Sequence, residues 1–425
     1  MSRASTCRGL RIASHTALLV ALLVALCAPL GGRGMVVVPA RAAQGFPTGA
    51  ANRAATPSVE INGGREIELD FEPVVLSPDG TSIAGIEDRS SICLFSIVDE
   101  DSRCRAVPRN GSILPASIVW APASSAIAFS LDALPTLRNS DIFIFDIARG
   151  DLVNLTPDPA PAKPDGETES PTSRGSHVMR PGDATPDSDG RPFWMDVFPA
   201  WSPDGSELVF ARHEIPDGSA AIMRISRTGG EAALAVDLAS IEIPFILGPI
   251  LWPEDDAIIF SGTGLRGGLR EASLKTGHVR LMLEADDPDL PDAVAVSASA
   301  DGEWLSVYSL RNVQRNNVEG FFGLVERATG EILIFTFANG PDQFVNVVPR
   351  FGPEASLLAA TFGGNPQTLH VWDITTARPV ASFSLSGDGP DIGLLLVGLS
   401  WAANGTILVP GPKESAQIVE VEVDP

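Results

Sequence analysis

The stretch FPAWSPDGSELVFARHE, residues 198–214, decides the fold. Pro203 sets φ for the first corner of a β-turn, Asp204 tolerates the bridge region, and Gly205 takes the positive φ that follows. The segments on either side, FPAW and ELVFA, are strand-like, so the unit is a tight β-hairpin. A hairpin this short cannot bury its own apolar faces, so we expect it to pack against further copies of the same unit.

The same unit recurs along the chain. The copies are LSPDG (76–80), WAPAS (120–124), WSPDG (201–205), WPEDD (252–256), ASADG (298–302), FGPEA (351–355) and WAANG (401–405). Successive copies begin 44 to 53 residues apart, with one interval of 81. An apolar strand and a second hairpin follow the turn in successive copies, which makes the repeat a unit of four antiparallel strands. This period is typical of β-propeller blades.

We therefore expect an all-β protein, a single β-propeller of seven blades with four antiparallel strands each. The seventh copy lacks a fourth strand, whereas residues 65–71 (REIELDF) are a spare strand before the first copy. This N-terminal strand is expected to pair with residues 415–424, complete the last blade and close the ring. Six blades would require one weak copy, the fourth or fifth, to be something else.

The N-terminal region predicts export. Residues 1–42 combine a basic start, an apolar core and a small-residue cleavage site, which together indicate a signal peptide. An uncleaved membrane anchor is the alternative. Residues 43–64 are expected to be a linker before the propeller at 65–425. We expect a secreted, periplasmic or cell-surface protein with no stable membrane span after cleavage.

The one long interval contains an insertion at about 157–195, which is rich in Pro, Ser, Gly and charged residues. Such a composition predicts a flexible surface loop. The formal net charge of −23, with only three lysines, argues against nucleic acid or an anionic membrane as partner. Cys93 and Cys104 lie on consecutive predicted strands around an acidic turn, so in an exported protein they are candidates for a cross-strand disulfide.

The repeats resemble those of TolB-type β-propellers, which are similar to WD40 repeats. The resemblance covers about residues 65–424 and is strongest at DVFPAWSPDG (196–205). It implies the propeller fold and says little about function, because one fold carries many functions. It also implies a place near the mouth of the central channel for Asp196, because TolB-like repeats often have Asp a few residues before this motif.

Two catalytic motifs are approached but not met. GLSWA (398–402) lacks the last Gly of the G-x-S-x-G nucleophile elbow. GTGLRG (262–267) fits the dinucleotide fingerprint, but a hairpin follows it where a helix is required. The sequence therefore predicts no enzyme.

Metal-binding patterns are equally weak. His177, His213, His278 and His370 are scattered over the repeats and are not expected to converge on one ion. TPDSDGRPFWMD (185–196) places Asp187, Asp189 and Asp196 near the ligand positions of a calcium loop, but Thr occupies the first position and two prolines interrupt it. We expect no cofactor, with calcium at these three aspartates as the weak candidate.

These observations favour an exported, non-catalytic and monomeric propeller that acts as a scaffold for protein partners. Asp196 and His213 are the candidate binding residues, since His213 is the histidine placed nearest the channel mouth, and the insertion is the preferred contact region. The alternative is a ligand-binding or carbohydrate-binding propeller, or one of hydrolase or lyase type, with its site in the central channel. This alternative predicts that acidic and aromatic residues from several blades converge.

Overall fold

The computed structural model describes residues 58–108, 111–133, 140–157, 193–215, 219–264, 266–309, 322–334, 345–362, 368–376, 378–385, 399–411 and 414–424. Their regular structure is β-strand except for two 3-10 turns, η1 (Pro115–Ser117) and η2 (Ala239–Ile241). Within these ranges there is no helix with the length and apolar character to cross a membrane.

The strands form antiparallel units, which we number in chain order; each has four strands except unit 2, in which two short strands, β6 and β7, both pair with β8. Units 1, 4, 5 and 6 are separate sheets: β2 (Glu72–Leu76), β3 (Ser82–Glu87), β4 (Ser91–Ser96) and β5 (Asp101–Ala106); β15 (Leu251–Glu254), β16 (Ala257–Gly262), β17 (Gly268–Ser273) and β18 (Val279–Glu284); β19 (Ala293–Ala298), β20 (Trp304–Ser309), β21 (Phe322–Glu326) and β22 (Ile332–Ile334); β23 (Val345–Phe351), β24 (Leu357–Phe362), β25 (Thr368–Asp373) and β26 (Arg378–Ser384).

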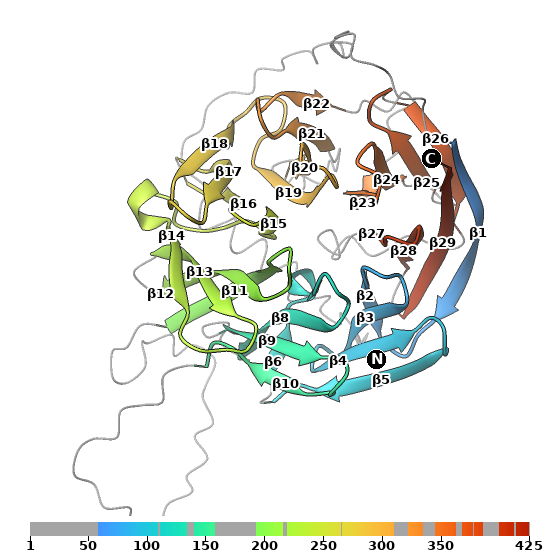
Figure 1. Ribbon diagram of the computed structural model, residues 1–425, viewed down its shortest axis with the longest axis horizontal. Coiled ribbons are helices and arrows are strands. Elements are labelled where there is room, and N and C mark those ends of the chain that lie inside the picture. The colour runs from blue at the N-terminus through green and yellow to red at the C-terminus, as the bar shows by residue number, and fades with distance from the viewer. Residues whose placement is uncertain are drawn as a thin grey trace, which may run out of the picture.

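Units 2 and 3 share one sheet, because a parallel bridge joins Ser140 to Met195. Unit 2 comprises β6 (Gly111–Ile113), β7 (Val119–Trp120), β8 (Ala126–Ala133), β9 (Ser140–Asp146) and β10 (Leu152–Asn154), and unit 3 comprises β11 (Phe193–Trp201), β12 (Glu207–Ile215), β13 (Ala220–Ser226) and β14 (Ala233–Asp237). β11 begins inside the expected insertion at about 157–195, most of which lies outside the described residues. Figure 1 shows the units arranged around a common centre, and in units 1, 4, 5 and 6 the first strand lies toward the centre and the last toward the rim.

Unit 7 joins the two ends of the described chain. β1 (Ser58–Glu68) pairs antiparallel with β29 (Ser415–Asp424), and the sheet continues through β28 (Thr406–Pro410) to β27 (Ser400–Trp401). The strand begins earlier than the expected 65–71 and takes in part of the segment 43–64 expected to be a linker. The reason is a register shift beside Gly63, whose φ of 139° lets the strand run through its glycines.

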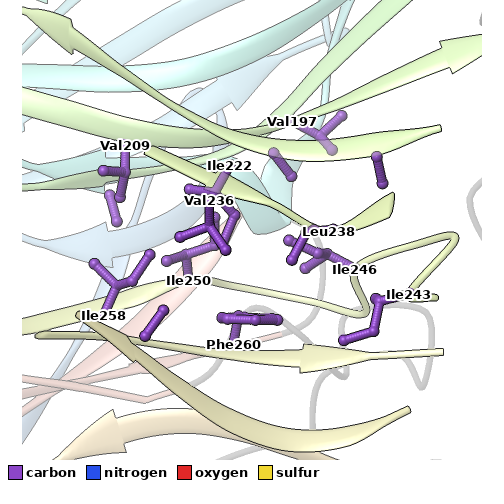
Figure 2. Close-up of a cluster of buried hydrophobic side chains, with 14 of the residues drawn as sticks. Val197, Val209, Ile222, Val236, Leu238, Ile243, Ile246, Ile250, Ile258 and Phe260 are labelled. Atoms are coloured by element: carbon purple, nitrogen blue, oxygen red, sulfur yellow. The ribbon is translucent and has the colours of Figure 1, made fainter. Parts of the chain in front are cut away.

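The core lies between neighbouring units. At the boundary of units 3 and 4, Val209 of β12 and Ile222 of β13 pack against Ile258 and Phe260 of β16 (Figure 2). Alternate residues of a strand reach the unit before and the unit after, so both faces of a sheet are buried. This explains why β16, AIIFSG, is buried along its whole length.

The Ser-Pro-Asp-Gly turn is a self-contained hydrogen-bond network. Ser202 Oγ donates to Asp204 Oδ1 (2.6 Å), the Ser206 amide donates to the same oxygen (3.0 Å), and the Glu207 amide donates to Ser202 Oγ (3.0 Å). Gly205 has φ of 70°, as the turn requires. Equivalent bonds form around Asp79 and Asp301. We call the end of the molecule that carries these turns the turn end.

The tryptophan before the turn fixes one unit against the previous one. Trp201 is 6% exposed, and its Nε1 donates to the carbonyl of Val119 in unit 2 (3.3 Å). Trp120 makes the same bond to Val75 in unit 1 (3.3 Å). The most recognisable motif of the sequence is therefore structural.

Cys93 and Cys104 lie directly opposite one another on β4 and β5, and their sulfurs are bonded. The disulfide closes the hairpin that holds the two outer strands of unit 1.

Candidate functional site

We call the end of the molecule opposite the turns the strand end. Here residues of units 2 and 3 are paired in one row across the sheet. Asp132 on β8 is paired with Ser140 on β9. Ser140 is bridged to Met195 on β11, which in turn is paired with His213 on β12. One row of paired residues therefore crosses both units and carries a carboxylate and an imidazole.

Asp196 lies one residue beyond this row, and its carboxylate forms an ion pair with Arg212. Arg212 donates from Nε to Oδ1 (2.8 Å) and from Nη2 to Oδ2 (2.7 Å), in the bidentate geometry that gives strong charge-assisted bonds. The carboxylate is 2% exposed and the arginine side chain 20%. The guanidinium lies over the rings of Trp194 (4.8 Å to the centroid) and Phe210 (5.4 Å). Asp196 therefore holds a cation in a fixed position.

His213 is a packing residue in this structure. It is 2% exposed, its ring stacks on Phe245 at 3.9 Å between centroids, and neither ring nitrogen has a hydrogen-bond partner of good geometry among the described residues. Burial lowers the pKa of His213 to about 4, so the ring is neutral at pH 7. Strand alternation turns it toward unit 4, with Val209 and Ala211, and away from the Asp196–Arg212 pair.

Asp132 is the residue that the sequence analysis missed. It is 8% exposed, and burial is the single cause of its pKa shift, with no contribution from a side-chain hydrogen bond or a charged neighbour among the described residues. Burial raises the pKa of Asp132 to about 6. A buried carboxyl with no partner is costly to keep, and such groups cluster at functional sites.

Asp132 and Arg212 face the same boundary from opposite sides. Ala126 and Ala128 of β8 pack against unit 3, so alternation places Asp132 on that face. Leu208 and Phe210 of β12 pack against unit 2, which places Arg212 on the facing side. Asp132, Asp196, Arg212 and Trp194 form what we call the unit 2–3 site.

A signal for Asp132 exists in the repeats. Ile127 pairs with Trp120 and Leu208 pairs with Trp201, and Asp132 and His213 each stand five residues further along their strands. The two strands AIAFSLD and ELVFARH thus end in a titratable group at the same position. A single polar residue at a strand end matches no known motif, so the sequence alone does not mark it as part of a site.

The remaining candidates do not join this site. Asp187 and Asp189, two of the three calcium candidates, lie outside the described residues. Both oxygens of the third, Asp196, accept hydrogen bonds from Arg212. His278 follows the strand β17 of unit 4 and His370 lies on β25 of unit 6, so the histidines in the described ranges belong to different units.

Comparison with known proteins places the fold. No family model and no curated protein matches the chain. Among solved structures, an oligogalacturonate lyase in complex with manganese is similar, with 12% identity, a TM-score of 0.51, and coverage of 84% of this chain and 98% of that one. TolB from Acinetobacter baumannii has 16% identity and a TM-score of 0.43 over 75% of this chain, which spans 65% of the TolB chain, less than two thirds. The predicted resemblance to TolB-type β-propellers is confirmed at the level of the fold.

The expected function is corrected by the same comparison. A non-catalytic scaffold for protein partners was the main expectation, and it is wrong: the neighbour that matches along nearly its whole length is a lyase. The alternative, a propeller with a ligand or catalytic site, agrees better with that finding. One similar structure is a lyase, so the absence of a catalytic motif does not decide whether the chain is an enzyme.

That neighbour is a complex with manganese, and a manganese ion in this chain would need several ligand groups close together. One group of three candidate ligands comes together in the described ranges, namely Glu87, Cys93 and Cys104. Its two sulfurs are joined in the disulfide, so they are not available as thiolate ligands. The described residues therefore do not fit a manganese centre.

Proposed function

We propose that this chain is a carbohydrate-active β-propeller of the lyase type, which binds an acidic oligosaccharide at the unit 2–3 site. The observation that carries the proposal is Asp132, a buried carboxyl that lacks a side-chain partner among the described residues and whose pKa is raised to about 6 by burial. A group that titrates near neutral pH both accepts and donates protons efficiently, which is what bond cleavage at a sugar ring requires.

The other residues of the site suit a sugar ligand. Arg212 supplies a positive charge for an acidic sugar, although Asp196 balances part of it. Trp194 lies beside that charge, and its aromatic face provides an apolar surface for a sugar ring. The alternative in the sequence analysis predicts that acidic and aromatic residues from several blades converge, and the acidic Asp132 of unit 2 faces the same boundary as Asp196 and Trp194 of unit 3.

The likeness to the oligogalacturonate lyase supports the ligand class. It concerns the fold alone, at 12% identity, but it extends over 98% of that chain. A chain of this span therefore suffices for a protein of that kind, and galacturonate, a sugar carboxylate, is the first ligand to test.

The experiment uses the purified chain with oligogalacturonides of defined length. Binding is measured by isothermal titration calorimetry, and cleavage by the ultraviolet absorbance of an unsaturated product. We expect Asp132→Asn to lower kcat by about 100-fold or more, and the wild-type rate to follow an apparent pKa near 6.

Asp101→Asn is the matched control, because Asp101 is an exposed aspartate at the far edge of unit 1. It should leave binding and turnover unchanged. Absence of both binding and turnover with acidic oligosaccharides, or full activity in Asp132→Asn, would refute the proposal.

We also infer that the units form seven blades closed into a ring, with β1 as the last strand of the seventh. The pairing of β1 with β29 supports this inference, as does the arrangement of the units around one centre (Figure 1). A cysteine pair at Glu66 and Gln417, which lie opposite each other, should form a disulfide and raise Tm. Failure of that pair to cross-link in the folded protein would count against closure.

We propose, finally, that the chain works outside the cytoplasm. The Cys93–Cys104 disulfide supports this location, because such bonds persist in oxidising compartments. Thiol labelling of protein from the exported and cytoplasmic fractions tests it: Cys93 and Cys104 should be blocked only in the exported protein, and free thiols at both positions there would contradict the proposal.

A further inference from the structure

The boundary of units 5 and 6 contains a buried phenol with an unused hydroxyl. Tyr308 on β20 is 9% exposed and packs with Leu358 and Ala360 of unit 6. Its Oη has no hydrogen-bond partner among the described residues. A buried hydroxyl without a partner costs free energy, so it calls for an explanation. Tyr308 is also the single tyrosine of the chain.

An arginine reaches toward the same place from unit 6. Arg350 on β23 donates from Nη1 to the backbone carbonyl of Val296 in unit 5. No carboxylate in the described ranges forms an ion pair with it, whereas Arg212 binds one carboxylate and Arg327 binds two. A guanidinium that is removed from water is normally paired, and among the described residues Arg350 has no carboxylate partner.

The two groups influence each other electrostatically. Burial raises the pKa of Tyr308, and the positive charge of Arg350 partly opposes that shift. Burial lowers the pKa of Arg350 to about 10, which still leaves the guanidinium charged at neutral pH. At neutral pH the pair therefore offers a cation and a neutral O–H donor.

The serines of this boundary are already used. Ser297 and Ser306 share a hydrogen bond (2.7 Å), Ser306 Oγ donates to the Pro349 carbonyl (3.0 Å), and the Phe351 amide donates to Ser297 Oγ (3.1 Å). These bonds hold β19, β20 and β23 together on either side of Arg350. The donors left over are the Tyr308 hydroxyl and the N–H groups of Arg350 that do not reach Val296.

We propose that Arg350 and Tyr308 form a binding site for a small oxyanion, a carboxylate or a phosphate. The guanidinium presents parallel N–H donors that match two oxygens of such a group, and the phenol supplies a further donor. This site lies between units 5 and 6, apart from the unit 2–3 site. It does not depend on the function proposed there.

The single tyrosine makes the site directly observable. Full-length chain labelled with 3-fluorotyrosine gives one 19F NMR signal, from position 308. Sodium acetate, sodium galacturonate and sodium phosphate are titrated separately at constant ionic strength set with sodium chloride. We expect a saturable shift of the signal with oxyanions and none with chloride alone, and the tighter arm identifies carboxylate or phosphate as the preferred source.

Variants separate the site from a general salt effect. Arg350→Gln removes the charged fork and should weaken the oxyanion affinity at least about tenfold. Arg350→Lys keeps the charge but not the fork and should fall in between. Arg105→Gln, at an exposed position on β5, is the control and should bind like the wild type.

A signal unmoved by all three anions would overturn the proposal, and so would a response retained in full by Arg350→Gln. Should Arg350→Gln fail to fold, an unchanged affinity in Arg350→Lys would overturn it instead. Asp132→Asn should leave the 19F response as it is in the wild type, so failure here and failure of the proposed function can be told apart.

Discussion

The two ends of the strands differ in how their polar groups are used. At the turn end, Ser202, Asp204 and their counterparts in other repeats bond to one another and to backbone amides within a few residues. At the strand end and between the units, Asp132, His213 and Tyr308 are buried without partners in the described part of the chain. The turn networks around Asp79, Asp204 and Asp301 are complete, whereas these three buried groups are not paired in the same way.

This difference separates groups that complete a local turn from groups that are buried where units meet. A repeat must carry its own turn, so the turn chemistry recurs, and it is complete around Asp79, Asp204 and Asp301. Ligand chemistry is needed once, so it appears in single residues at variable positions of one or two units. The following changes test this division.

The largest effect is expected from the turn end. Trp201→Ala removes a buried indole between units 2 and 3 and should lower the free energy of unfolding by about 3–5 kcal/mol, measured by urea denaturation. The folded fraction should bind ligand as the wild type does. Trp201→Phe should lose less, and a variant as stable as the wild type would show that the motif tryptophan is not a packing residue.

A change of opposite sign is expected for Asp132. Its pKa in the folded state, about 6, lies above the ordinary value of 3.8, so ionisation opposes folding. The cost is absent below about pH 4, grows as pH rises toward 6, and is complete above that, at about 2–3 kcal/mol. Asp132→Asn should therefore gain stability relative to the wild type between pH 4 and 7.

Denaturation curves of both proteins across that pH range provide the measurement, with Asp101→Asn as reference. If the stability difference between wild type and Asp132→Asn does not vary with pH, Asp132 is not the buried acid described above.

The smallest effect is expected for Asp204→Asn. Hydrogen bonds from the Ser202 hydroxyl and from Ser206 lower the pKa of Asp204 to about 2. The stability that the carboxylate contributes is present above pH 4 and is lost as pH falls through 2. Because the Asn amide oxygen still accepts hydrogen bonds, we expect a slightly lower Tm that is constant from pH 5 to 8. A strong pH dependence of this difference within that range would contradict the network seen at the turn.

The fold was accessible from the sequence because its signals are local. The turn at 202–205, the strand that follows it and the pairing of an N-terminal strand with 415–424 depend on short patterns and on their repetition. The start of β1 was missed because Gly63 and Gly64 resemble a break, whereas a register shift carries the strand through them.

The site was less accessible because it depends on contacts between repeats. Asp196 was singled out, but its partner Arg212 became evident only from the strand register. His213 was placed near the channel mouth, and the structure buries it under Phe245, a residue of the following connection. The shifted pKa values of Asp132 and Arg350 result from burial against a neighbouring unit. Such burial cannot be read from the local sequence.

The pairing of β1 with β29 has a consequence for biosynthesis. A nascent chain exposes β1 before the other described strands, and its partner β29 is completed only when residues 415–424 emerge. Throughout synthesis β1 is thus an open strand edge, the kind of surface that recruits other chains. Glu60, Glu66 and Glu68 point to solvent on this strand, and repulsion between their carboxylates would hinder edge-to-edge association until β29 arrives.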